Sequence, residues 1–383
     1  MGGKGAGDVI RRDRAAVPST SRRVAALDGL RGLVIVSVVV NHAVGVLWTR
    51  GPIYDVPIVN GLLGGGAVIV FFVVGGFIVT DGLLRERERG TFDPWRFYLR
   101  RLVRVGGQVV AVCVVVGIAL RLDPEVPDGA DIPTNVLHAL TYTFNLLVST
   151  DPFAVQPEFG HLWYLGVQQQ CYLILPLLLV VLGRWRPVLV ALLVALMVAV
   201  YIHRQDVLDE RGWVVASSLT TTRSDGLLWG VALAVALPWL SRWRAWGHVL
   251  WISALVLLAL KLALPELSTY AYLRSWSIPF TLVAGIVVVA VWLLPAPTRV
   301  SRALEWAPLR RLGRASLAIF VWHLPIFVIV SRHTESWSWI ERTFVSVVIL
   351  IVVVWASERW IDEPIRRLLA TRSVFRMSRE QLP

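Results

Sequence analysis

Long apolar segments recur along the chain, each about as long as a lipid bilayer is thick. A helix rises about 1.5 Å per residue, so roughly 20 apolar residues cross a hydrocarbon core of about 30 Å. Such segments lie near 27–48, 60–84, 102–121, 162–183, 187–203, 214–239, 246–264, 276–295, 313–331 and 343–361. The pattern predicts an all-α integral membrane protein with about ten transmembrane helices.

Arginine clusters between these segments indicate the orientation of the chain. Cytoplasmic loops of membrane proteins carry an excess of basic residues. Arginines gather within 11–23, 85–101, 184–186, 242–244, 299–311 and 366–376, whereas the connection 123–131 is acidic. This alternation predicts a multi-pass protein of the inner (plasma) membrane with both termini in the cytoplasm.

One further apolar segment, 134–150, disturbs this alternation. It is short and contains Asn135, His138 and Asn145. The charge pattern is consistent only if this segment makes no complete crossing, so we expect it to be re-entrant or to lie at the outer face. Irregular backbone at membrane depth must be covered by protein or line a wet cavity. Residues 134–163 are therefore expected to form a wall of an outward-facing site.

Composition excludes a soluble globular protein. Only 17% of the residues are charged, below the level of about 25% in soluble domains, and the mean hydropathy is +0.64. The net charge of +12 comes from arginines between apolar segments, which indicates topology and argues against a nucleic-acid partner. Cys113 and Cys171 both lie within apolar segments, so neither a disulfide framework nor a metal cluster is predicted.

A single membrane domain accounts for most of the chain. Residues 1–26 are polar and rich in Gly and Arg, which predicts a disordered cytoplasmic tail. The first apolar segment is too long for a signal-peptide core, and no small-residue cleavage site follows it. We expect a membrane domain over 27–367, without internal repeat or appended soluble domain, and a cytoplasmic tail over 368–383.

Titratable residues inside the first apolar segment are candidate functional groups, because a charge at the centre of a membrane helix costs about 2.5–3.5 kcal/mol. Arg31 and His42 are about 20° apart on one helix face, with an axial separation of about 16 Å. Asp28 lies on nearly the same face. In one interpretation, His42 only forms a hydrogen bond with a neighbouring helix, and Arg31 only anchors the cytoplasmic end of the span. The shared face favours function, because a neutral imidazole can accept a proton from a hydroxyl.

Other polar groups have two interpretations each. One arginine cluster consists of Arg100, Arg101 and Arg104. It either marks the cytoplasmic side of the membrane or forms a phosphate site, because one guanidinium can donate two parallel hydrogen bonds to phosphate oxygens. The glutamines at 168–170 either join helices or line a cavity.

The later apolar segments contain further polar groups. Arg223 and Asp225 are most simply a neutralising ion pair or part of one, and His323, beside Pro325, faces either a ligand or its packing neighbours. Many of the 18 tryptophans lie at expected interfaces, where an aromatic belt explains them without a substrate.

Taken together, these residues resemble the acyltransferase family 3 of membrane O-acyltransferases. The resemblance covers roughly residues 23–367 and rests on seven motifs in order: Ala26–Gly32 followed by His42; Phe71–Thr80; Phe97–Arg101; His161–Leu165 continuing to Tyr172, Leu173 and Pro176; Arg223–Gly230; Leu312–Gly313 continuing to Trp322–Pro325; and Glu363–Pro364.

The chain departs from the family pattern at three positions. Serine is usual at the position of Gly75, glutamate is usual at that of Gln168, and glutamate is often found at that of Gln169. A glutamine cannot accept a proton, so these positions lack the acid–base capacity of the family pattern.

The resemblance implies transfer of an acyl group, commonly acetyl, from cytoplasmic acyl-CoA to a hydroxyl. The acceptor is expected to be a sugar, glycan, glycolipid or glycosylated small molecule of the cell envelope. Acyl-CoA (acetyl-CoA) would be a co-substrate, and no metal is expected.

The resemblance also implies roles for the candidate residues. The CoA nucleotide would lie against Arg31, Arg100, Arg101 and Arg104, with the pantetheine arm extending toward His42. His42 would act as a general base or carry the acyl group itself, supported by Arg31 and Asp28.

On the acceptor side, His161 and Trp163 would shape an outer pocket. The remaining candidate substrate-binding residues are Gln168, Arg223, Asp225 and His323.

Two other interpretations stay open. Intramembrane Arg and Asp also occur in transporters, so the chain could export an acylated or lipid-linked sugar, although it shows no internal repeat. Alternatively, the departures at Gly75 and Gln168 could indicate an inactive relative that acts as a partner. Alanine at His42 separates these hypotheses, because it abolishes acyl transfer by an enzyme and leaves an inactive partner unaffected.

Overall fold

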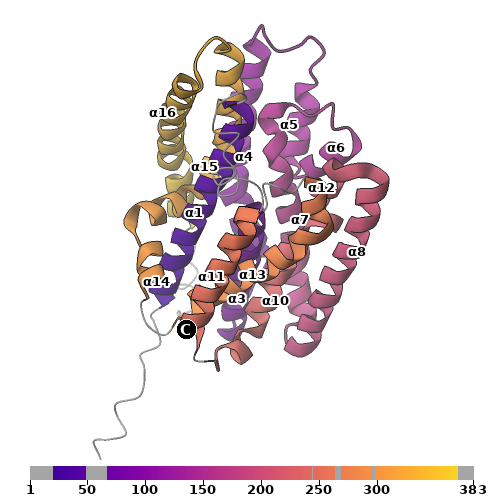
Figure 1. The fold of residues 1–383 in the computed structure, drawn as a ribbon, viewed down its shortest axis with the longest axis vertical. Coiled ribbons are helices and arrows are strands. Elements are labelled where there is room, and N and C mark those ends of the chain that lie inside the picture. Colours follow the sequence, from indigo (N-terminus) through magenta and orange to yellow (C-terminus); the bar gives the residue numbers. More distant parts are fainter. Residues whose placement is uncertain (1–19, 49–66, 244, 264–268, 295–297, 370–383) are drawn as a thin grey trace, which may run out of the picture.

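The structure is a computed structural model that describes residues 20–48, 67–243, 245–263, 269–294 and 298–369. Within these ranges every regular element is a helix and none is a strand. Figure 1 shows the helices side by side in an elongated bundle. The expected tails lie outside the described residues except for 20–26 and 368–369, and so do residues 60–66 of the second expected span.

Eight helical segments of the described chain are long and apolar enough to cross a membrane. Their main helices are α1 (Thr20–Val46), α3 (Ala67–Glu88), α4 (Pro94–Leu122), α7 (Trp163–Leu182), α8 (Arg186–Ser218), α13 (Ser277–Leu293), α15 (Ala307–His333) and α16 (Trp339–Ser357). Two shorter apolar helices, α10 (Asp225–Leu240) and α11 (Trp246–Ala263), occupy the other two expected spans. The predicted all-α integral membrane fold is confirmed.

Short elements connect these helices. They are α5 (Ile132–Leu140), α6 (Phe144–Thr150), η2 (Pro157–Leu162), α9 (Thr220–Arg223), α12 (Thr269–Ala271), η4 (Tyr272–Trp276), α14 (Arg299–Leu304) and η5 (Glu358–Asp362).

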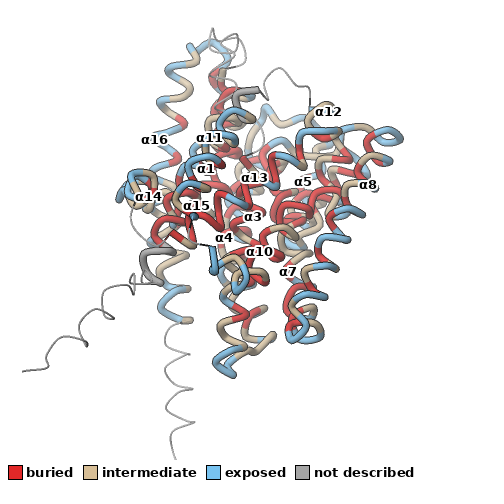
Figure 2. The backbone as a smooth tube through the Cα atoms, turned by 60° about the horizontal axis from the view of Figure 1, so that its bottom comes forward, coloured by how far each residue is buried: buried red, intermediate tan, exposed pale blue. Residues whose placement is uncertain are grey.

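Burial separates a central helix from peripheral ones. In the most apolar stretch of α15, 78% of the residues are buried, compared with 22% in α8 and in α16. Figure 2 shows buried positions in the middle of the bundle and exposed positions along α8 and α16. The exposed side chains of these outer helices include large apolar ones such as Ile202 and Ile351, which suit contact with lipid.

The central helix α15 runs parallel to α1. Arg31 of α1 donates to Ser316 of α15 at 2.7 Å, and Ser331 of α15 donates to the carbonyl of Val46 at 3.2 Å. Both contacts advance in the same direction along the two helices, which defines the parallel pairing. The backbones approach so closely that a Cβ at Gly313 would overlap the backbone of α1, which is the close approach that glycine permits.

The segment 134–150 forms α5 and α6, each too short to cross a bilayer. The amide of Asn135 makes hydrogen bonds of 2.8 Å with two backbone groups of the loop after α6. Asn145 donates to Thr220 at 3.1 Å, and its oxygen accepts from Gln170 at 2.9 Å. These asparagines thus join an irregular segment to its neighbours, as buried backbone requires.

Helix α8 differs from the expected pattern, because it continues beyond residue 203 to Ser218. Gly212 interrupts its helical backbone with φ 81° and ψ 175°, a left-handed conformation that glycine adopts readily. The expected span 214–239 is consequently divided between the end of α8, the short α9 and the 16-residue α10.

The connections divide between two ends of the bundle. Arg186 pairs with Glu88 at 2.8 Å, which joins the connections after α3 and α7 at one end, here called the basic end. At the opposite end, Arg332 of α15 pairs with Asp123, which follows α4, at 2.8 Å and also with Glu158 of η2. The starts of α1, α4 and α15 lie toward the basic end.

Candidate active site

A cavity of about 180 Å³ lies among α1, α3, α4, α7 and α15 toward the basic end. This volume is below the roughly 300–1,000 Å³ of pockets that enclose drug-sized ligands, so the cavity suits the end of a larger molecule. Its polar lining residues are Arg31, Arg101, Arg104, Tyr164, Gln168, Tyr172 and Ser316, and its apolar lining residues include Val74, Ile78 and Phe320.

The Arg31 side chain is held between two partners. It donates to Ser316 at 2.7 Å and contacts the Asp28 carboxylate at 3.4 Å. Asp28 lies one helical turn before Arg31, so it compensates the charge while leaving the guanidinium at the cavity wall. Asp28 itself does not line the cavity.

Arg101 is oriented by α7. Its Nε and Nη2 atoms donate to Gln169 and Gln168 at 3.3 Å each, and its guanidinium lies 3.8 Å from the centre of the Tyr172 ring. Gln168 in turn donates to the hydroxyl of Tyr164 at 2.8 Å. Polar and cation–π contacts together fix the arginine against the cavity.

Arg100 lies outside the cavity, unlike its neighbours Arg101 and Arg104. Its Nη2 atom donates to both carboxylate oxygens of Glu86, at 2.8 and 3.1 Å. Adjacent helical residues point about 100° apart, so the expected arginine group divides into two that face the cavity and one that binds α3.

The two departures from the family pattern lie against each other. A Cβ at Gly75 would lie 2.6 Å from the hydroxyl of Tyr172 and 3.3 Å from Nε2 of Gln168. The missing side chain therefore provides the space that the Tyr172 hydroxyl occupies at the cavity wall.

His42 and His323 form a pair whose tautomers follow from their neighbours. Nδ1 of His323 lies 3.0 and 2.7 Å from the carbonyl oxygens of Ile319 and Phe320, so it carries the proton and leaves Nε2 as an acceptor. Nδ1 of His42 lies 2.9 Å from the carbonyl of Val38 and 3.1 Å from Nε2 of His323, so it donates. Nε2 of neutral His42 is then unprotonated, and within the described chain it makes no hydrogen bond.

Phe320 lies between the cavity and the histidines. It lines the cavity, and its ring centre is 5.0 Å from that of His161 and 5.8 Å from that of His323. His161 is buried, and its Nε2 atom lies 3.2 Å from the carbonyl oxygen of Val321. His42, His161 and His323 therefore form one cluster that is separated from the cavity by an aromatic side chain.

The other expected substrate-binding residues lie away from this cavity. Asp225 pairs at 3.0 Å with Arg204, and both side chains are fully buried. Arg223 is not the partner of Asp225, and its guanidinium lies 5.8 Å from the ring centre of Trp163. Asp225 therefore belongs to an intramembrane ion pair as expected, but its basic partner is Arg204 and not Arg223.

Four residues of this region were not among the candidate site residues of the sequence analysis: Tyr164, Tyr172, Ser316 and Phe320. Tyr164, Gln168 and Tyr172 recur every four positions, which places them on one helix face and could have identified the two tyrosines. Ser316 and Phe320 give no comparable signal. Within the described residues, no group of three or more His, Cys, Asp or Glu side chains could hold a metal ion.

Comparisons with known proteins agree with the motif order. The family model of the acyltransferase domain, Acyl_transf_3, matches residues 24–358. The chain is 28% identical to the peptidoglycan O-acetyltransferase OatA of Listeria monocytogenes, over 90% of this chain and 56% of that protein. It is 25% identical to the O-acetyltransferase OatA of Staphylococcus aureus, over 90% of this chain and 58% of that protein.

The chain thus spans little more than half the length of these curated relatives. No solved structure matches it significantly.

Proposed function

Because the chain belongs to the acyltransferase domain family, we propose that it is a membrane O-acetyltransferase that uses cytoplasmic acetyl-CoA and modifies a glycan hydroxyl. The observation that supports this proposal is the arrangement along the parallel pair of α1 and α15. Arg31 and Ser316 lie at the cavity, and His42 and His323 lie farther along the same two helices. The relatives' names support acetyl as the group and a glycan as the acceptor.

The donor would bind at the basic end. Arg31, Arg101 and Arg104 line one cavity, and guanidinium groups bind phosphate oxygens through paired hydrogen bonds. The CoA phosphates would lie over these arginines, while the cavity would hold the pantetheine end. Arginine-rich connections favour the cytoplasmic side of a membrane, where acyl-CoA is available.

His42 would act as the general base. Its Nε2 atom takes the proton of the acceptor hydroxyl while the hydroxyl oxygen attacks the thioester carbonyl. The new C–O bond forms, the C–S bond breaks, and the His42 imidazolium returns the proton to the departing thiolate. His323 would hold the His42 ring in the tautomer that leaves Nε2 free.

The thioester needs a path from the cavity to His42. Phe320 lies on the shortest route, because it lines the cavity and its ring centre is 5.0 Å from that of His161 and 5.8 Å from that of His323. We therefore include rotation of the Phe320 side chain as a step that precedes transfer.

The test uses membranes that contain the protein or an empty vector, incubated with acetyl-CoA labelled in the acetyl group. The proposal expects label in a glycan fraction, released by mild alkali as an ester is. No protein-dependent label, or label that resists alkali, would contradict O-acetyl transfer.

A further inference from the structure

A second and larger hollow lies at the opposite end of the bundle. This cleft of about 850 Å³ lies among the ends of α1 and α15 and the start of α16. Its side chains with recognition chemistry are Trp48, Arg332, Glu335, Trp337, Trp339 and Arg342. Three indoles with two guanidinium groups and one carboxylate form a combination that none of the roles proposed above uses.

The cleft begins about one helical turn beyond the histidine pair. Gly45 and Val46 line it and follow His42 by three and four positions, which is a rise of about 5–6 Å. Val328, five positions after His323, lines it from α15 with a rise of about 7–8 Å. His42 and His323 therefore lie between the arginine-lined cavity and this cleft.

Two of the three indole walls of the cleft, Trp48 and Trp339, are held in place by side-chain contacts. Trp48 donates from Nε1 to Thr343 at 2.6 Å, and its ring centre lies 5.7 Å from that of Trp339 in an edge-on contact. Trp337 is 45% exposed, so its ring remains available to a ligand. An aromatic surface that is already ordered loses little entropy on binding.

The arginine walls are also held. Arg342 donates from Nε to the carbonyl of Thr334 at 2.8 Å, and from Nη2 to the carbonyl of Glu335. These two bonds engage only part of its guanidinium, which has further N–H donors for a ligand.

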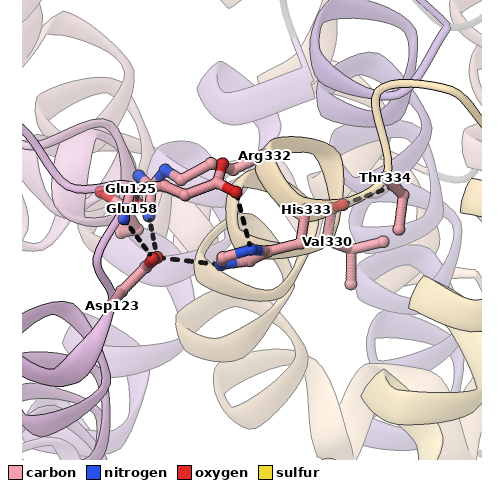
Figure 3. Close-up of polar contacts among 7 residues, drawn as sticks. All are labelled: Asp123, Glu125, Glu158, Val330, Arg332, His333 and Thr334. Atoms are coloured by element: carbon pink, nitrogen blue, oxygen red, sulfur yellow. Dashed lines mark hydrogen bonds and ion pairs between the residues drawn. The ribbon is translucent and has the colours of Figure 1, made fainter.

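Figure 3 shows how carboxylates hold Arg332. Its guanidinium pairs with Asp123 at 2.8 Å and with the buried Glu158, and His333 lies 3.0 Å from the same Asp123. Burial raises the pKa of Asp123, but hydrogen bonds from the backbone of Glu125 and from Arg332 and His333 outweigh it and lower that pKa. Asp123 thus stays charged at neutral pH and fixes one wall of the cleft.

We propose that this cleft binds the acceptor as a saccharide chain, an inference that rests on the proposed function. A sugar ring has C–H faces that pack on indoles and hydroxyl edges that pair with guanidinium and carboxylate groups. The Glu335 carboxylate and the three indoles favour a saccharide over a phosphate headgroup, which two arginines alone would accept. The cleft also places a hydroxyl of its ligand on the side of His42 away from the donor cavity.

An aromatic belt at the membrane interface is the alternative explanation of these tryptophans. Trp213 provides the matched control, because it is 51% exposed and does not line the cleft. If both residues serve only as belt residues, substituting Trp213 or Trp337 should change saccharide affinity to a similar extent. If Trp337 binds the saccharide, only its substitution should change that affinity.

The test measures binding of a soluble N-acetylglucosamine tetrasaccharide to the detergent-purified full chain by ligand-observed NMR titration, without donor. We expect Trp337→Ala to weaken binding about 5- to 10-fold and Trp213→Ala to leave it unchanged. No binding to the wild type, or equal affinity of the wild type and Trp337→Ala, would overturn the cleft proposal.

Acetyl-CoA affinity, measured separately, should stay unchanged in both variants. Because saccharide binding needs neither donor nor chemistry, it can succeed even if acetyl transfer is absent. The two proposals can therefore fail independently.

Discussion

Nε2 of His323 lies 3.1 Å from Nδ1 of His42, although 281 positions separate the two residues in the chain. The pairing follows from the parallel packing of α1 and α15. If His42 is the base, as proposed, His323 holds its ring in position. The His323 ring cannot reverse this arrangement without losing the carbonyl contacts of its Nδ1 atom.

Substitution of His323 by Ala should lower kcat about 10- to 100-fold, less than the roughly 100- to 10,000-fold contribution of the base itself, because His323 acts only through His42. The KM values for donor and acceptor should change little, because His323 lines neither the cavity nor the cleft. The pH profile of kcat should also move, since the His42 ring loses its neighbour. An unchanged pH profile with lower protein stability would assign His323 a purely structural role.

The arginines of α4 provide an internal comparison. Arg101→Gln should raise the KM for acetyl-CoA about 10- to 100-fold, as expected for the loss of a hydrogen bond to a charged group. Arg100→Gln should not, because Arg100 binds Glu86 outside the cavity. Steady-state kinetics of the two variants check this difference, and equal KM values would place the donor elsewhere.

The space at Gly75 is required by the Tyr172 hydroxyl. Gly75→Ala should destabilise the protein by about 1–3 kcal/mol, the usual cost of overpacking, because the new Cβ lies 2.6 Å from that oxygen. Addition of Tyr172→Phe should recover much of the loss by removing the oxygen. Gly82→Ala is the control, since a Cβ there meets nothing within 4 Å. Thermal unfolding in detergent gives the stability of the wild type, the two single glycine variants and the double variant. A double variant that is no more stable than Gly75→Ala would contradict the steric explanation.

The buried ion pair of Arg204 and Asp225 should matter more than an exposed one. Asp225→Asn leaves a fully buried guanidinium uncompensated, which costs about 3–5 kcal/mol. Asp209→Asn breaks the pair with Arg274, whose side chains are 49% and 43% exposed, and exposed pairs contribute at most about 1 kcal/mol. Chemical denaturation of the two variants tests this contrast, and equal losses would refute it.

The length of the apolar segments could predict the membrane fold, because a chain that crosses a hydrocarbon core of fixed thickness must satisfy its backbone hydrogen bonds internally, as a helix does. It left residues 204–213 between two expected spans, but it could not predict that α8 continues through this polar connection as far as the break at Gly212. The sequence also placed Arg31 and His42 on one face, and both contact α15.

Long-range partners were beyond sequence reasoning. Arg204 pairs with Asp225 from a different helix, and no local spacing distinguishes it from Arg223 as the partner. Likewise, Arg100 and Arg101 are neighbours of the same type, and only the packing of α3 and α7 against α4 separates their roles.

Under the proposed function, His42 performs the chemical step between the donor cavity and the acceptor cleft. The most direct measurement compares the wild type and His42→Gln for transfer of labelled acetyl to glycan, together with their affinities for acetyl-CoA. We expect transfer to fall at least about 100-fold while the donor affinity stays unchanged. Retained transfer, or a loss explained by weaker donor binding, would contradict His42 as the base.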